Sequence, residues 1–229
     1  MPKPVFVLLL LLSARIYGQT DSTENSTQKG WTVTLTGALI PAGPTALGIQ
    51  PGAEYKFNDR LSLLSEITFK AFPRNSGSLQ DRHYMRFKSE LRWHFFTRKK
   101  RAFHEYAGFQ AAYSFRRFIN SSGYYYENQE RDSVIFFDKA KIKSPIATFA
   151  LQVGTIIADG RFVVDVFMGF GARIVQTTPS DVSNPRKGIV IPRAFYRVAA
   201  YNYAGTVVQF HFNTGIRFMW HFYDFQHSR

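Results

Sequence analysis

The stretch RHYMRFKSELRWHF, residues 82–95, alternates between two kinds of side chain. One set is mostly apolar and consists of His83, Met85, Phe87, Leu91, Trp93 and Phe95. The other set is polar or charged and consists of Arg82, Tyr84, Arg86, Lys88, Glu90, Arg92 and His94. Side chains of a β-strand point alternately to its two faces, whereas a helix repeats every 3.6 residues. The stretch therefore predicts a strand with one apolar and one charged face.

The same two-residue period continues on both sides of this strand, from Trp31 to Phe222. It predicts eight strands, at residues 31–39, 47–57, 61–71, 82–95, 103–116, 146–158, 162–174 and 208–222. Pro51 falls within the second strand and predicts a β-bulge there. Each segment has the length of about ten residues that a tilted strand needs to cross a bilayer.

The connections between these strands differ in length. Short turns are expected at residues 58–60, 97–101 and 159–161, and longer loops at 73–81, 117–144 and 176–204. Only the connection at 40–46 departs from this pattern. Outer-membrane barrels have short periplasmic turns and longer extracellular loops. The pattern predicts an all-β fold, a closed antiparallel transmembrane β-barrel of about eight strands.

Two features favour a membrane barrel over a soluble barrel of lipocalin type, whose apolar face points inward. Large apolar side chains occur on every strand and would overfill a narrow interior, whereas about seven glycines fall on the opposite faces. Among 23 Phe, 12 Tyr and 3 Trp, aromatic residues recur at the turn-side strand ends: Trp31, Phe57, Trp93, Phe95, Phe103, Phe162, Trp220 and Phe222. Such aromatic girdles mark the lipid–water interfaces of membrane barrels.

The N-terminal residues have the composition of an export signal. Lys3 precedes an unbroken apolar run from Val5 to Leu12, so residues 1–18 are expected to be a cleaved signal peptide. Residues 19–30 then form a polar tether, residues 31–225 the barrel and residues 226–229 a tail. The chain contains no Cys, which favours a bacterial envelope protein over a disulfide-rich secreted domain. The expected location is the cell outer membrane.

Two segments carry a resemblance to a known class of protein. Residues 86–96 (RFKSELRWHFF) and 159–171 (DGRFVVDVFMGFG) resemble strands of the small outer-membrane β-barrel families of Gram-negative bacteria. The resemblance implies an eight-stranded barrel. Many of these families have no known function, so it assigns no activity.

The polar faces concentrate charge inside the expected barrel. We expect an interior charge network formed by Glu54, Glu66, Arg86, Lys88, Glu90, Arg92, Asp165, Arg173 and Arg217. Charges buried in a narrow interior require partners, so a plug of ion pairs is the favoured interpretation and a selective anion path is the alternative. In particular, Asp165 and Arg217 are expected to meet. His94, His104 and His221 face the interior without the spacing of a metal site, and no cofactor is expected.

The long loops offer a candidate binding surface, formed by Tyr124, Tyr125, Tyr126, Arg193, Tyr196 and Arg197. Tyr and Arg are common in binding surfaces, although hairpins that pack on themselves would contain the same residues. The net charge of +13 is spread along strands and loops. It therefore favours contact with membrane lipids, including anionic lipopolysaccharide head groups, or a basic interior, over nucleic acid. Other envelope proteins are the second class of partner expected.

These observations lead to three hypotheses for function. The first is a non-enzymatic outer-membrane barrel with a structural or binding role, at the cell surface or as a subunit of an envelope or secretion assembly. The second is a narrow transport barrel for small anionic or hydrophobic solutes. The third is a lipid-modifying enzyme, for which the sequence places no nucleophile beside a base.

Overall fold

A computed structural model describes residues 30–40, 46–70, 79–95, 103–127, 133–159, 162–188 and 202–221. These residues form ten strands: β1 (Gly30–Ile40), β2 (Ala46–Lys56), β3 (Leu61–Lys70), β4 (Leu79–His94), β5 (Phe103–Tyr126), β6 (Val134–Lys143), β7 (Ile146–Asp159), β8 (Phe162–Ser183), β9 (Arg186–Gly188) and β10 (Gly205–His221). The expected signal peptide, residues 19–29 of the expected tether and the C-terminal tail lie outside the described residues, whereas Gly30, the last residue of the expected tether, begins β1. The described part of the chain has no helix with the length and apolar character needed to span a membrane.

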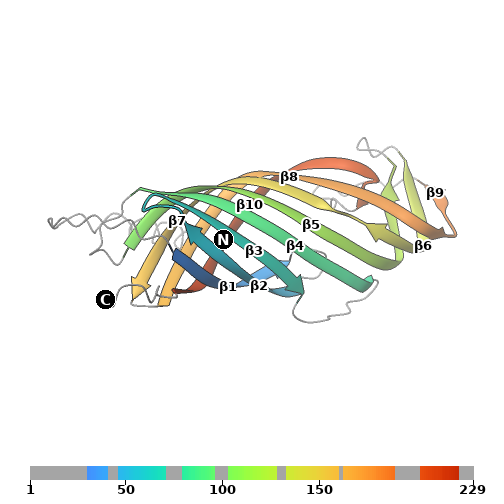
Figure 1. Cartoon of the computed structure of the whole chain (residues 1–229). Helices are drawn as coiled ribbons and strands as arrows, with labels where there is room; N and C mark the ends of the chain where they lie inside the picture. Colours follow the sequence, from blue (N-terminus) through green and yellow to red (C-terminus); the bar gives the residue numbers. More distant parts are fainter. Residues whose placement is uncertain are drawn as a thin grey trace, which may run out of the picture.

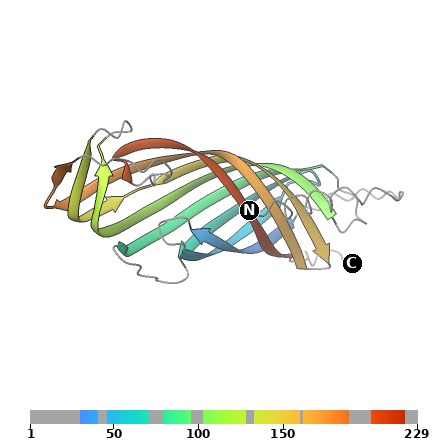
Figure 2. The same cartoon turned by 180° about the vertical axis from the view of Figure 1, so that it is seen from behind.

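Eight of the strands form an antiparallel ring. β1, β2, β3, β4, β5, β7, β8 and β10 pair in this order, and β10 pairs back with β1 from Thr32↔His221 to Thr36↔Arg217. Figure 1 shows these strands running obliquely side by side. Figure 2, from behind, shows β10 lying along β8 and meeting β1 near its end. The predicted all-β, antiparallel architecture with eight principal strands is confirmed.

The strands of the ring are staggered. Cross-strand partners lead from Val33 on β1 to Phe210 on β10, through Ala53, Ser65, Ser89, Ala111, Phe149 and Ala172. Across the closing contact, however, Val33 pairs with Trp220. Following the pairs once around the ring therefore ends on β10 ten residues away from the direct partner of Val33. This offset is the shear that a closed ring of tilted strands requires.

Apolar side chains point away from the ring, and polar ones point into it. On β5, the Phe109 side chain is 50% exposed and Gln110 is fully buried. The same alternation appears on the other ring strands, whose buried polar residues include Thr34, Gln50, Glu66, Lys88, Gln152, Asp165 and Arg217. The facing predicted from the two-residue period therefore matches the burial of these strands.

The structure corrects the expected loop at residues 117–144. β5 continues to Tyr126, and β6 pairs with this extension from Arg117↔Lys143 to Tyr126↔Val134. β8 likewise continues to Ser183 and also pairs with β6, which pairs in turn with β9. Figure 1 shows β6 and β9 together at one end of the ring. The two-residue period does not reveal β6 because consecutive residues, Val134 and Ile135, are both buried there.

The bulge expected at Pro51 is also absent. Pro51 pairs with Leu35 on β1, and the register between β2 and β3 is the same on both sides of it, at Ile49↔Phe69 and Gly52↔Glu66. A proline lacks the backbone N–H that a ladder on both sides requires. The chain accommodates it as a gap in the β2–β3 pairs without shifting the strand.

Glycines on the inner face make room for large side chains. A Cβ added at Gly154 would lie 2.5 Å from the ring atoms of Tyr106, its cross-strand neighbour on β5. Gly215 lies in the same way against the ring of Phe167. Both rings are buried with Ile156, Val163 and Met219 in one apolar cluster. Glycine is needed at position 154 because the tyrosine ring occupies the space that a side chain would take.

We expect Gly154→Ala to lower the free energy of unfolding by about 1–3 kcal/mol, since overpacking a close contact costs this much. The measurement is urea unfolding of both proteins. In a Tyr106→Leu background the same substitution should cost less, because the ring that it meets is gone. Equal costs in the two backgrounds would contradict the contact.

Candidate functional site

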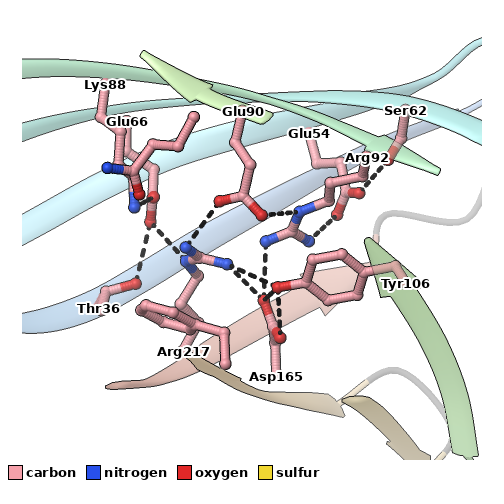
Figure 3. Close-up of polar contacts among 12 residues, drawn as sticks. Thr36, Glu54, Ser62, Glu66, Lys88, Glu90, Arg92, Tyr106, Asp165 and Arg217 are labelled. Atoms are coloured by element: carbon pink, nitrogen blue, oxygen red, sulfur yellow. Dashed lines mark hydrogen bonds and ion pairs between the residues drawn. The ribbon is translucent and has the colours of Figure 1, made fainter. Parts of the chain in front are cut away.

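Arg217 lies at the centre of a buried ion-pair cluster inside the ring (Figure 3). Its Nη1 atom lies 2.5 Å from Oδ2 of Asp165, and its Nη2 atom lies 2.9 Å from Oε2 of Glu90. Its Nε atom lies 3.3 Å from Oε1 of Glu66. These four side chains are fully buried. The β8–β10 register creates the first contact, because Arg217 and Asp165 are direct cross-strand partners.

Arg92 on β4 holds the other half of this cluster. Its Nε atom lies 2.9 Å from Glu90, on the same strand and face, and its Nη2 atom lies 2.7 Å from Asp165. Its Nη1 atom lies 3.3 Å from Glu54 on β2. Glu90 and Asp165 thus bridge two guanidinium groups, Arg92 and Arg217. This sharing ties β4 to β8 and β10 across the interior.

Neutral and cationic neighbours complete the coordination of the carboxylates. The Tyr106 hydroxyl donates to Asp165 at 3.0 Å, Ser62 donates to Glu54 at 2.5 Å, and Thr36 donates to Glu66 at 3.0 Å. Lys88 forms an ion pair with Glu66. The guanidinium groups also lie over aromatic rings, Arg92 over Tyr106 and Arg217 over Phe167. The cluster joins β1, β2, β3, β4, β5, β8 and β10 (Figure 3).

The structure brings together most of the residues expected in the interior charge network: Glu54, Glu66, Lys88, Glu90, Arg92, Asp165 and Arg217. It does not bring Arg86 or Arg173 into the cluster. Arg173 donates from Nε and Nη2 to Gln209, at 3.1 and 2.6 Å, and the buried Nε atom of Arg86 has no hydrogen-bond partner. Both lie nearer the β6 end of their strands. Their positions in the two-residue alternation predict that they face inward. The alternation does not predict how far along the ring axis they lie.

The sequence interpretation missed a close serine–histidine contact. Ser62 Oγ lies 2.9 Å from His94 Nε2, so a hydroxyl does lie beside a base, contrary to expectation. Glu54 accepts from this same hydroxyl and lies 3.9 Å from the same imidazole nitrogen. A catalytic triad instead places the acid on the other nitrogen and exposes the nucleophile. Because Ser62 is fully buried, its role here is to bind Glu54.

The residues of the expected loop surface are only partly described, and one of them is buried. The Tyr126 side chain is 1% exposed and packs with Val134, Tyr203 and Val207. Its ring stacks on Tyr203 with the centroids 5.4 Å apart. Tyr126 is therefore core, whereas Tyr124 and Tyr125 are partly exposed. Arg193, Tyr196 and Arg197 lie outside the described residues.

In the described part of the chain, no three His, Asp or Glu side chains are grouped as a metal site would require. Comparison with family models, with curated proteins and with solved structures found no match in any of the three. The candidate site therefore has to be interpreted from its geometry. Its closely paired charges are suited to cross-linking strands.

Removing one charge of the cluster should cost more than removing a matched pair. Arg217→Ala leaves buried carboxylates without their partner, and we expect a loss of about 3–5 kcal/mol in the free energy of unfolding. The double variant with Asp165→Ala should be more stable than Arg217→Ala alone, with a coupling energy of about 1–3 kcal/mol. Urea unfolding of the four proteins of this cycle provides the measurement. Strict additivity would show that the two charges do not interact.

Proposed function

We propose that this protein is a transmembrane β-barrel of a Gram-negative outer membrane with a structural or binding role. It acts at the cell surface or as a subunit of an envelope assembly, and it is not an enzyme. The observation that carries the proposal is the inverted distribution of side chains. Charged residues are buried inside the ring, and large apolar residues cover its outside.

The exposed apolar surface supports a lipid environment. Large hydrophobic side chains that are more than a third exposed occur on every strand of the ring, including Leu35, Ile49, Phe69, Leu91, Phe109, Leu151, Phe170 and Phe212. Monomeric soluble proteins rarely expose continuous apolar patches larger than a few hundred Å². Lipid chains would cover this surface, and the paired strands leave the backbone satisfied within the ring.

The stagger of the ring supports the same location. Eight strands with a shear of ten residues, at the usual rise of about 3.3 Å and strand spacing of about 4.8 Å, tilt by about 40°. Outer-membrane strands tilt by about 35–45°. At this tilt ten residues span about 25 Å, the height of the apolar band of such barrels.

The turn-side ends of the strands carry exposed aromatic residues. Trp31, Phe57, Trp93 and Phe162 are 40% exposed or more. Tyr55 contacts both Trp31 and Phe57, with centroids 4.8 and 5.2 Å apart. Aromatic rings at a common level are typical of the membrane interface. The proposed barrel thus has its periplasmic interface at this end and its β6 end outside the cell.

The buried cluster favours a structural or binding role over transport. It connects opposite sides of the ring through paired charges, and an eight-stranded barrel has an interior just wide enough for side chains. The extended hairpins of β5, β6 and β8 would project beyond the bilayer and present a surface to partners. The basic residues above the cluster, Arg86 and Arg173, would face this outer mouth.

Arginine substitutions at two exposed positions distinguish a lipid environment of the outer face from an aqueous one. Phe109, midway along the ring portion of β5, is 50% exposed, and Val208, near the β6 end of β10, is 66% exposed. In the membrane, Phe109→Arg should lower the free energy of unfolding in vesicles by about 2–4 kcal/mol and Val208→Arg by about 0–1 kcal/mol. If the outer face were in water, both would be nearly neutral. Equal small costs would contradict the proposal.

The folded protein should migrate differently on SDS gels before and after boiling, because a closed barrel resists SDS until it is heated. In planar bilayers this gel-shifted form should produce no steady conductance, since the ion-pair cluster closes its interior. Reproducible open channels with anion selectivity would favour the transport hypothesis instead. A soluble monomer recovered without detergent would contradict the membrane location.

A further inference from the structure

Three basic side chains form one row across the outer face at the β6 end of the ring. His83 on β4 pairs with Arg117 on β5, and Arg117 pairs with Lys143 on β6. All three are exposed and share the outward face of their strands. Direct cross-strand neighbours have Cβ atoms about 4.5–5.5 Å apart, so the hydrogen-bond donors of these three side chains can converge on one anion. These residues are called the basic row below.

An apolar groove of about 560 Å³ adjoins the basic row. Its lining includes the three residues of the row and the apolar or aromatic side chains of Phe69, Met85, Tyr113, Phe115 and Pro145. Phe69 pairs with Met85 and Met85 with Phe115, two residues closer to the middle of the ring than His83 and Arg117. Over two residues along β4 and β5, the outward-facing side chain thus changes from a basic one to an apolar one, from His83 to Met85 and from Arg117 to Phe115.

The structure provides no acidic partner for two members of the row. Among the described residues, no carboxylate lies within 4 Å of the cationic groups of Arg117 or Lys143. The neighbouring cation on the same face of β6 differs, because Lys141 donates to Asp181 at 2.8 Å. That hydrogen bond lowers the pKa of the Asp181 carboxyl. Arg117 and Lys143 therefore present positive charge outside any direct ion pair of the described residues, directly beside an apolar groove, although Lys143 also acts through space on Asp181.

We propose that the basic row and the groove bind a phosphorylated glycolipid of the lipid A class. A phosphate group would lie between Arg117 and Lys143, with His83 beside it, and an acyl chain would lie along Phe69 and Phe115. Charge-assisted hydrogen bonds from guanidinium and ammonium groups are the strong contacts for phosphate. The proposal rests on the outer-membrane location, which would place this row at the level of the outer-leaflet head groups.

The test uses the full chain folded in detergent micelles, with purified bisphosphorylated lipid A, dephosphorylated lipid A and phosphatidylglycerol as probes. Native mass spectrometry measures the affinity for each. Wild type should prefer bisphosphorylated lipid A, and Arg117→Gln with Lys143→Gln should weaken that binding by about tenfold or more. The matched control, Arg186→Gln with Lys187→Gln, removes the same charge from exposed positions of β9. It should change the affinity by less than about twofold.

Three results would overturn the lipid site. Equal losses in both double variants would show general electrostatic attraction, and equal binding of dephosphorylated lipid A would exclude a phosphate site. Equal binding of phosphatidylglycerol would show recognition of any anionic lipid.

The SDS gel shift is measured on the same samples. A wild-type protein that lacks the shift would count against the barrel itself, whereas a shifted protein without lipid preference would count only against the site. Single Arg117→Lys and Lys143→Arg variants, which keep the charge, should retain binding.

Discussion

The pairing of β1 with β10 is the contact on which the rest of the structure depends. It is short, running only from Thr32↔His221 to Thr36↔Arg217 in the described part of the chain, yet it converts a sheet with two edges into a ring with an inside and an outside. The ring allows charged side chains from distant strands to meet, because Glu54, Arg92 and Arg217 all face the same enclosed space. In an open sheet the charged side chains of distant strands would not meet. They would then lie on an uncovered face without ion-pair partners.

Two classes of charge in the molecule have different consequences. Inside the ring, Arg92 and Arg217 each contact three carboxylates, and hydroxyl groups of Thr36, Ser62 and Tyr106 complete the set. Such a cluster links strands that lie on different sides of the ring. Outside, Arg117 and Lys143 adjoin an apolar groove. The first class would hold the proposed barrel together, and the second would connect it to its membrane.

The sequence predicts the ring strands because each has one apolar and one polar face, a pattern that a two-residue period reveals directly. It also predicts which charged residues face inward, since the position of a residue in the two-residue alternation decides its face. The level of each residue depends on the stagger of the whole ring, and this is why Arg86 and Arg173 were expected in the cluster and are not there. The β5 extension and β6 were missed because apolar and polar residues do not alternate there: Val134 and Ile135 are both buried, and three tyrosines follow one another at residues 124–126. For the same reason Tyr126 was expected at a surface and is core.

The most direct test of the account is an accessibility scan of β7 in lipid vesicles. The chain contains no Cys, so single cysteines at Phe149, Ala150, Leu151, Gln152 and Val153 can each carry a spin label without a background signal. The account predicts that labels at 149, 151 and 153 collide with oxygen dissolved in the lipid and are shielded from a water-soluble nickel chelate, while labels at 150 and 152 are shielded from oxygen. Preferential collision of the outward-facing labels with the nickel chelate would show that the apolar face is in water and would contradict the account.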